Sequence, residues 1–219
     1  MMKIIATLVL LFIFCFAKAQ EPFPFWNEVQ ALKKKDSSLF PAPAQILFIG
    51  SSSFTLLRDT VNIFPGYKML NRAFGGATLE DVIRYRYDVI YPYQPKQIVL
   101  YCGENDLASS DTVTVEITVQ RFKTLFQLIR AKYPSVPFVY ISMKPSPARV
   151  HLMSKMKQAN QLIASFLKTK TAARFINIFD AMLKSDGTPN ESLFRQDMLH
   201  MNPKGYTIWK KKLLPVLLK

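Results

Sequence analysis

Residues 97–106 read QIVLYCGEND, and the fold class follows most directly from them. The first six residues are almost continuously apolar, which is typical of a strand buried on both faces of a parallel sheet. The run ends at Gly103, and three polar residues, Glu104-Asn105-Asp106, follow at once. In parallel sheets, ligand sites lie beyond the carboxyl ends of the strands. The stretch therefore predicts a buried strand with functional side chains directly after it.

Four further apolar runs occur at 44–49 (AQILFI), 67–70 (YKML), 137–143 (PFVYISM) and 174–179 (RFINIF). Apolar residues recur at helical spacing in the stretches between them, at 79–90, 119–129 and 152–166. A further helix is expected to begin at Pro203, because proline suits the first position of a helix. This alternation predicts a three-layer α/β/α sandwich around a doubly wound, five-stranded parallel sheet.

Residues 1–19 are predicted to be a secretory signal peptide. Lys3 gives a positive start, residues 4–16 are apolar with one exception, and Ala17-Lys18-Ala19 fits a cleavage site. An uncleaved membrane anchor is the alternative, but the apolar run is shorter than the about 20 residues that a span needs. We therefore expect an exported protein, periplasmic or extracellular. Residues 20–219 are expected to form one domain, which begins with a short helical extension at 20–43.

Composition narrows the classes of function. Without residues 1–19, Cys102 is the single cysteine, so an internal disulfide is impossible and a buried, inert thiol is expected. The formal net charge of +14 is spread among acidic residues, and its densest runs, 33–35 and 210–212, are short. No nucleic-acid-binding module accompanies them. We expect no specific nucleic-acid partner, and no transmembrane segment once the signal is cleaved.

Three short segments after predicted strands are candidates for chemistry. Ser52 follows the first strand at a strand-to-helix turn, where it can be an exposed nucleophile or simply a helix cap. Gly75-Gly76 can let a backbone N–H approach a ligand, or can form a tight turn. The Asn105 amide can donate to a developing oxyanion, or can close a turn with its own backbone. Taken singly, each segment leaves both interpretations open.

A fourth candidate segment, Asp197-Met198-Leu199-His200, lies near the C-terminus. An aspartate three residues before a histidine can reach Nδ1 across a turn, which fixes the tautomer and leaves Nε2 free as a base. The other histidine, His151, begins a helical segment without such a partner and is expected to lie on the surface. The pattern favours His200 as the general base.

In this order the four segments resemble the blocks of the GDSL/SGNH hydrolase family, and the resemblance spans nearly all of the chain after residue 19. Gly50-Ser51-Ser52 matches the first block and Gly76 the second. Gly103-Glu104-Asn105-Asp106 matches the third, and Asp197 with His200 matches the last. The family usually has aspartate before its nucleophile, where this chain has Ser51, although some branches look like this one. Residues 144–149 (KPSPAR) resemble a loop of envelope members.

The resemblance implies a flavodoxin-like SGNH hydrolase fold and a serine esterase that works through an acyl-serine intermediate. It implies Ser52 as nucleophile, His200 as general base and Asp197 as the residue that orients the imidazole. The backbone N–H groups of Ser52 and Gly76, with the Asn105 amide, would form the oxyanion hole. No cofactor is implied, and two histidines with one remaining cysteine are too few for a metal cluster.

The expected substrate is a carbohydrate or small-molecule ester. Short connections between the elements leave no obvious lid, which favours short acyl groups such as acetyl. A lysophospholipase-like or lipase-like acylhydrolase of the same family is one alternative. A non-catalytic envelope binding module is another, although the complete set of candidate residues argues against it. The α/β-hydrolase fold is disfavoured because its Gly-x-Ser-x-Gly elbow is missing around Ser52.

Overall fold

The computed structural model describes residues 23–57 and 63–219, so the predicted signal peptide lies outside the described residues. The described residues contain a five-stranded sheet of order β2-β1-β3-β4-β5, in which every neighbouring pair is parallel. The strands are β1 (Ile46–Gly50), β2 (Met69–Asn71), β3 (Gln97–Tyr101), β4 (Phe138–Ile141) and β5 (Ala173–Ile176). This order is that of flavodoxin-like sheets, and it confirms the predicted parallel sheet.

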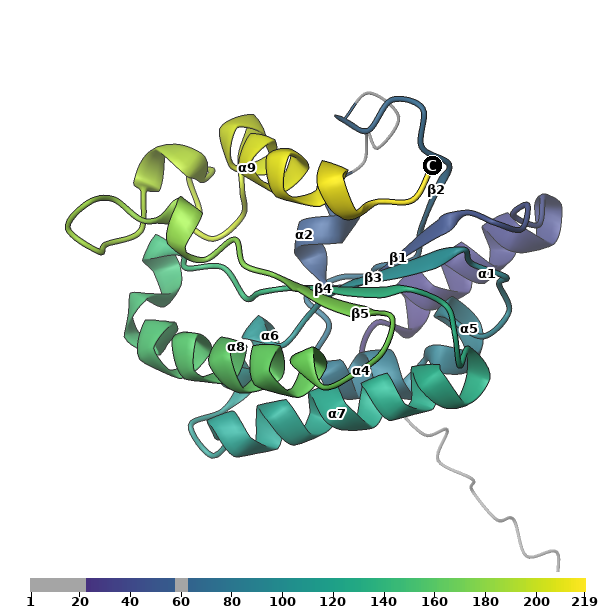
Figure 1. Cartoon of the computed structure of the whole chain (residues 1–219), viewed down its shortest axis with the longest axis horizontal. Helices are drawn as coiled ribbons and strands as arrows, with labels where there is room; N and C mark the ends of the chain where they lie inside the picture. The colour runs from purple at the N-terminus through teal and green to yellow at the C-terminus, as the bar shows by residue number, and fades with distance from the viewer. Residues whose placement is uncertain (1–22, 58–62) are drawn as a thin grey trace, which may run out of the picture.

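Helices cover both faces of the sheet (Figure 1). One layer contains α1 (Trp26–Ser38), α4 (Leu79–Arg84), α5 (Arg86–Val89), α6 (Glu104–Ser109), α7 (Val115–Lys132) and α8 (Met153–Lys168). The other contains α2 (Ser52–Thr55) and α9 (Pro203–Leu213). Neighbours along a strand pack into different layers: Leu47 and Ile98 belong to the first apolar cluster, Phe48 and Val99 to the second. Burial on both faces explains the continuous apolar runs, and it confirms the three-layer sandwich.

Local capping fixes where two helices begin. The Thr78 side chain accepts from the Asp81 N–H, and the Asp81 carboxylate accepts from the Thr78 N–H, so α4 starts with a capping box. Pro203 occupies the first turn of α9, as predicted, and the Asn202 side chain accepts from the N–H groups that follow. No helix in the described ranges is long and apolar enough to cross a membrane.

The N-terminal helix α1 is fastened to a turn that matters for the site. The Phe25 ring packs on Phe74 with ring centroids 5.6 Å apart. The Glu28 carboxylate accepts a 2.7 Å hydrogen bond from the Gly75 N–H. The turn held in this way carries Gly76, the residue expected to supply an oxyanion-hole N–H. The extension therefore braces one edge of the candidate site.

The segment between β5 and α9, residues 177–202, differs from expectation. It contains the turns η2 (Asp180–Met182) and η3 (Glu191–Leu193) and two isolated bridges, Leu183 with Pro189 and Phe194 with Met201. The expectation of short connections throughout is therefore wrong at this place. The bridge between Phe194 and Met201 closes a hairpin-like loop that presents Asp197 and His200.

The strand order puts the carboxyl ends of β1 and β3 side by side. The chain leaves β1 for β2 on one side, and β3 pairs on the other side, with Gly50 opposite Tyr101. Parallel α/β sheets bind their ligands at such a switch point. Residues that directly follow these two strands, among them Ser52 and Asn105, therefore lie beside each other in the fold.

Candidate active site

A sharp turn after β1 presents Ser52. Gly50 has φ of 126°, and a Cβ added there would lie 1.9 Å from the Tyr101 carbonyl oxygen, so only glycine fits. The Ser51 N–H donates to that same oxygen at 3.0 Å, so the turn is hydrogen-bonded to the last residue of β3. Ser51, not Ser52, occupies the N-cap position of α2, and its side chain makes no capping bond. The Ser52 hydroxyl is thus left for another partner.

That partner is His200, which lies 148 residues further along the chain. The Ser52 Oγ is 3.1 Å from His200 Nε2, and His200 Nδ1 is 2.7 Å from Asp197 Oδ2. The structure therefore brings together the three residues that the family resemblance implies as nucleophile, base and orienting acid. An imidazole that donates from Nδ1 to the carboxylate can accept the serine proton at Nε2.

The Asp197 carboxylate is held by the turn that it closes. Its Oδ1 accepts from the N–H groups of Leu199 at 2.9 Å and His200 at 2.8 Å, while Oδ2 contacts the imidazole. Partial burial opposes its ionisation, but these hydrogen bonds together lower the pKa of Asp197 to about 2. The carboxylate is therefore charged at neutral pH. Its side chain is 46% exposed, and contact with water also favours the charged form. One side chain both shapes the loop and orients the base.

The low pKa of Asp197 predicts a pH-dependent contribution to stability. An unfolded aspartate has a pKa near 3.9, so the stabilisation is fully present above about pH 4 and is lost as the pH falls towards about 2. Asp197→Asn keeps an oxygen for the two N–H groups but removes the charge. We expect the excess of the wild type over this variant in free energy of unfolding to shrink as the pH falls from about 4 towards about 2.

Urea unfolding of both proteins between about pH 7 and about pH 2 measures this difference. Asp111→Asn, which removes an exposed charge elsewhere, is the matched control. A difference between wild type and Asp197→Asn that stays constant down to about pH 2 would contradict the proposed role of the charge.

Asn105 and Gly76 face each other across the turn after β2. The Asn105 Nδ2 donates to the Ala77 carbonyl at 3.1 Å, and a Cβ added to Gly76 would lie 3.7 Å from that nitrogen. A primary amide carries two N–H donors, so one remains for a ligand. Asn105 comes from the start of α6, which follows the left-handed Gly103. The Asn105 amide nitrogen and the Gly76 backbone are therefore neighbours at the end of the sheet.

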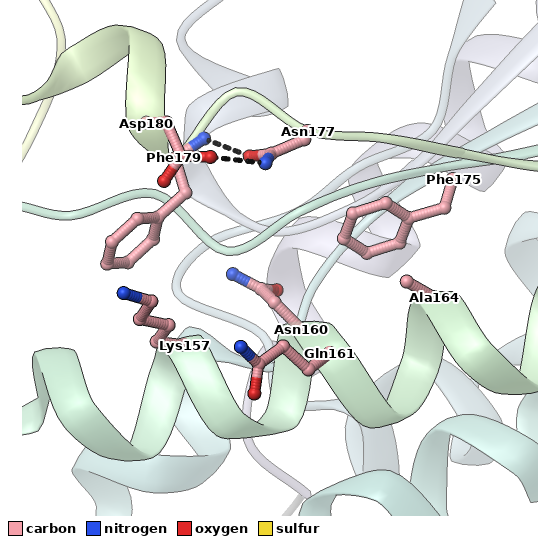
Figure 2. Close-up of a pocket in the computed structure, with 8 residues that line it drawn as sticks. All are labelled: Lys157, Asn160, Gln161, Ala164, Phe175, Asn177, Phe179 and Asp180. Atoms are coloured by element: carbon pink, nitrogen blue, oxygen red, sulfur yellow. Dashed lines mark hydrogen bonds between the residues drawn. The ribbon is translucent and has the colours of Figure 1, made fainter.

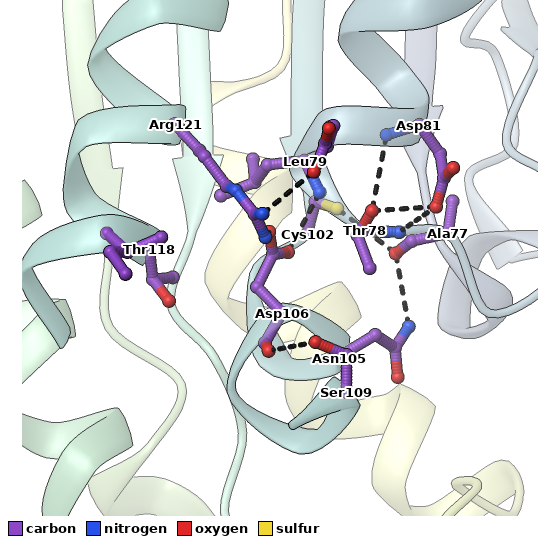
Figure 3. Close-up of polar contacts among 12 residues, drawn as sticks. Ala77, Thr78, Leu79, Asp81, Cys102, Asn105, Asp106, Ser109, Thr118 and Arg121 are labelled. Carbon is purple, nitrogen blue, oxygen red and sulfur yellow. Dashed lines mark hydrogen bonds and ion pairs between the residues drawn. The ribbon is translucent and has the colours of Figure 1, made fainter. Parts of the chain in front are cut away.

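Asp106 connects the segment after β3 to the start of α4 and to α7. This role was not predicted from the sequence. Figure 3 shows its carboxylate between the start of α4 and Arg121 of α7. Oδ2 accepts from the Leu79 N–H at 2.8 Å, and Oδ1 lies 3.1 Å from Arg121. Burial raises the pKa of Asp106 to about 6, and these partners offset only part of that effect. The residue after Asn105 thus anchors the helix that follows the Gly76 turn.

Cys102 lies in the same region and is inert. Its thiol is buried and lies 3.3 Å from the Ala77 carbonyl oxygen. Burial raises the pKa of the Cys102 thiol well above its usual range. It is a packing residue of the strand end, as expected.

A buried charged cluster, formed by Glu104, Lys144, Arg149 and Tyr101, lies beside Asn105. Lys144 Nζ and Arg149 Nη1 each lie 3.0 Å from Glu104 Oε1, and the Tyr101 hydroxyl donates to Glu104 Oε2. Burial opposes ionisation of Glu104, but the two cations lower the pKa of that carboxyl. Glu104 lies 40 positions from Lys144 and 45 from Arg149 in the sequence, so local spacing does not reveal that the two segments meet.

Two pockets differ in what lines them. The one beside Ser52 has an empty volume of about 180 Å³, open solvent included, and its lining includes Asn105, Arg149 and Leu199. A larger one, of about 460 Å³ on the same measure, lies between α8 and β5 (Figure 2). It is lined by Lys157, Asn160, Gln161, Ala164, Phe175, Asn177, Phe179 and Asp180. Because the smaller pocket is lined by Ser52 and Asn105, it is the candidate active site.

The family model, the sequence relatives and the solved structures that this chain resembles all include lipases, acylhydrolases or esterases. Residues 55–208 match the GDSL-like Lipase/Acylhydrolase family; Ser52 lies just before this range. Platelet-activating factor acetylhydrolase IB subunit alpha1 of Homo sapiens is 25% identical over 181 residues, which cover 80% of this chain and 76% of that protein. A GDSL-like lipase from Bacteroides thetaiotaomicron has a TM-score of 0.69 at 19% identity, covering 84% and 94% of the two chains. An acetylxylan esterase from Geobacillus stearothermophilus has a TM-score of 0.62 at 14% identity, covering 80% and 94%.

A parallel α/β/α sandwich with a serine, a histidine and an aspartate in hydrogen-bonded sequence at its strand ends is typical of serine hydrolases. The family match covers well over half of the chain. The protein belongs to the GDSL-like lipase/acylhydrolase family and is a hydrolase that acts on ester bonds.

Proposed function

We propose that the protein removes short acyl groups, chiefly acetyl, from carbohydrate or small-molecule esters, with Ser52 as its nucleophile. The observation that carries the proposal is the continuous hydrogen-bonded path from Ser52 Oγ through His200 to Asp197. A serine hydroxyl is a weak nucleophile until an adjacent base accepts its proton, and this path supplies such a base.

The proposed reaction has two half-reactions. Ser52 Oγ attacks the ester carbonyl carbon while His200 Nε2 takes the hydroxyl proton. The oxyanion that forms accepts hydrogen bonds from the Ser52 and Gly76 N–H groups and from the Asn105 amide. Collapse breaks the bond to the alcohol, which leaves with the proton from His200. Water then attacks the acyl-serine by the same steps, and the carboxylic acid and free Ser52 are regenerated. Asp197 stabilises the transient imidazolium.

The size of the pocket supports a short acyl group. Its empty volume is only about 180 Å³ even with open solvent included, which leaves little room for a long acyl chain. Its lining is mostly polar and includes Asn105 and Arg149, so a long alkyl chain would find little apolar surface there. The names of two relatives, an acetylhydrolase and an acetylxylan esterase, both specify acetyl esters. An export signal at residues 1–19 would place this activity in the periplasm or outside the cell.

Rates on p-nitrophenyl acetate, butyrate and octanoate test the acyl preference, with Ser52→Ala as the background control. We expect kcat/KM to be highest for acetate and to fall with chain length. Acetate release from acetylated xylo-oligosaccharide is then compared with fatty-acid release from a lysophospholipid. A strong octanoate and lysophospholipid preference would favour the lipase-like alternative. A folded wild type that is inactive on all these esters would favour the non-catalytic binding module.

A further inference from the structure

The amide of Asn105 is held at both ends. Its Nδ2 donates to the Ala77 carbonyl at 3.1 Å, and its Oδ1 accepts a hydrogen bond from Arg149 Nη2 at 2.8 Å. An asparagine amide can flip, and the flip exchanges donor for acceptor. A flipped Asn105 would turn its oxygen towards the Ala77 carbonyl and its NH₂ towards the Arg149 guanidinium. Both contacts would then be repulsive, so Arg149 and Ala77 select the same orientation.

Arg149 is itself held by a buried anion. Its Nη1 lies 3.0 Å from Glu104 Oε1, and the Glu104 side chain is only 4% exposed. Lys144, with 2% of its side chain exposed, reaches the same carboxylate at 3.0 Å. One carboxylate therefore holds two cations. Lys144 already compensates the buried charge of Glu104, so Arg149 is not needed for that purpose.

The shape of the guanidinium explains why arginine suits this position. Its planar fork lets one nitrogen bind Glu104 while the other binds Asn105, whereas a lysine ammonium is a single point of charge on a flexible stem. The Arg149 loop is also tied to the loop of the base, since the Ala148 N–H donates to the Met198 carbonyl at 3.0 Å. Arg149 thus lies where the Asn105 loop and the Asp197–His200 loop meet.

We propose that Arg149 is a positioning residue for the oxyanion hole. Held by Glu104, it fixes the Asn105 amide so that the free N–H of Nδ2 points to where the substrate oxyanion forms. This assigns a function to the KPSPAR segment at residues 144–149, which the esterase mechanism does not otherwise use. The inference rests on the proposed esterase activity, in which Asn105 is an oxyanion donor.

Arg149→Met tests the proposal, because methionine retains an apolar stem but no donor. We expect kcat on p-nitrophenyl acetate to fall by about 10- to 100-fold with KM changed by less than about threefold, since the lost interaction acts in the transition state. Arg149→Lys keeps the charge beside Glu104 and should lose nearly as much, because it lacks the fork. Arg174→Met, an exposed arginine on β5, is the matched control and should leave kcat unchanged.

A double-mutant cycle separates positioning from general support of the structure. If Arg149 acts through Asn105, Arg149→Met should add little to the loss already caused by Asn105→Ala. Effects that multiply in the double variant, or a kcat within about twofold of wild type in Arg149→Met, would overturn the proposal. Thermal unfolding shows whether Arg149→Met is folded. If it is not, the cycle is run with Arg149→Lys instead. An active wild type with an unaffected Arg149 variant refutes this inference alone, whereas an inactive wild type refutes the esterase proposal and this inference with it.

Discussion

Ser52→Ala should lower kcat for p-nitrophenyl acetate by about 10⁴-fold or more, because it removes the oxygen that lies against His200 Nε2. His200→Ala should cost a similar factor, since the 3.1 Å contact between Oγ and Nε2 is the means of removing the serine proton. The two residues act as a unit, so the double variant should be hardly slower than either single one. Steady-state rates of the wild type, the two single variants and the double variant measure these losses in kcat.

The neighbouring serine provides the matched control. Ser51→Ala changes the hydroxyl one position before Ser52, and the Ser51 side chain makes no bond in its capping position. It should keep most of the activity. If Ser51→Ala were as inactive as Ser52→Ala while folded, or if Ser52→Ala kept more than about a tenth of the wild-type kcat, the assignment of the nucleophile would be wrong.

Asn105→Ala should lower kcat by about 10²- to 10³-fold and change KM little, which is the cost of removing one oxyanion donor. The reason is geometric: Nδ2 faces Gly76 and donates one N–H to the Ala77 carbonyl, which leaves the other N–H for the substrate. The charge that this N–H stabilises exists only in the transition state. Uniform substrate binding should therefore be nearly unaffected.

Two further asparagine variants sharpen the Asn105 test. Asn105→Asp keeps the shape but replaces the donor by a negative oxygen, so it should be at least as damaging as alanine. Asn177→Ala removes an exposed asparagine beside the other pocket and should leave kcat unchanged. An Asn105→Ala protein whose loss appears in KM alone would contradict an oxyanion role and indicate ground-state binding.

Much of the fold could be predicted from the sequence because the sheet is buried on both faces. Five apolar runs marked the strands, and the start of α9 followed from Pro203. Strand ends were less accurate: residues 177–179 were expected to continue β5. In the structure the Asn177 side chain accepts from the Phe179 N–H and ends the strand. Such a side-chain turn competes with the strand locally, and apolar pattern alone does not reveal it.

The predicted site residues share one feature, which is that each directly follows a strand or lies in the final loop. The supporting residues do not share it. Glu28 reaches Gly75 across 47 positions, and Arg149 reaches Asn105 across 44. Their roles depend on how loops that are distant in sequence meet at the sheet edge. Local patterns of residues do not show such contacts. The KPSPAR segment resembles a loop of the family, but the contact between its Arg149 and Asn105 exists only in the tertiary structure.

Covalent trapping tests most directly whether Ser52 is the nucleophile. A fluorophosphonate transfers its phosphonyl group to an activated serine, and mass spectrometry of the digested protein locates the adduct. We predict that the wild type gains one phosphonyl group, on Ser52, and loses ester hydrolysis in proportion. Ser52→Ala should remain unlabelled. An adduct on Ser51 or Ser53, or a folded wild type that hydrolyses esters yet takes up no label, would contradict the assignment.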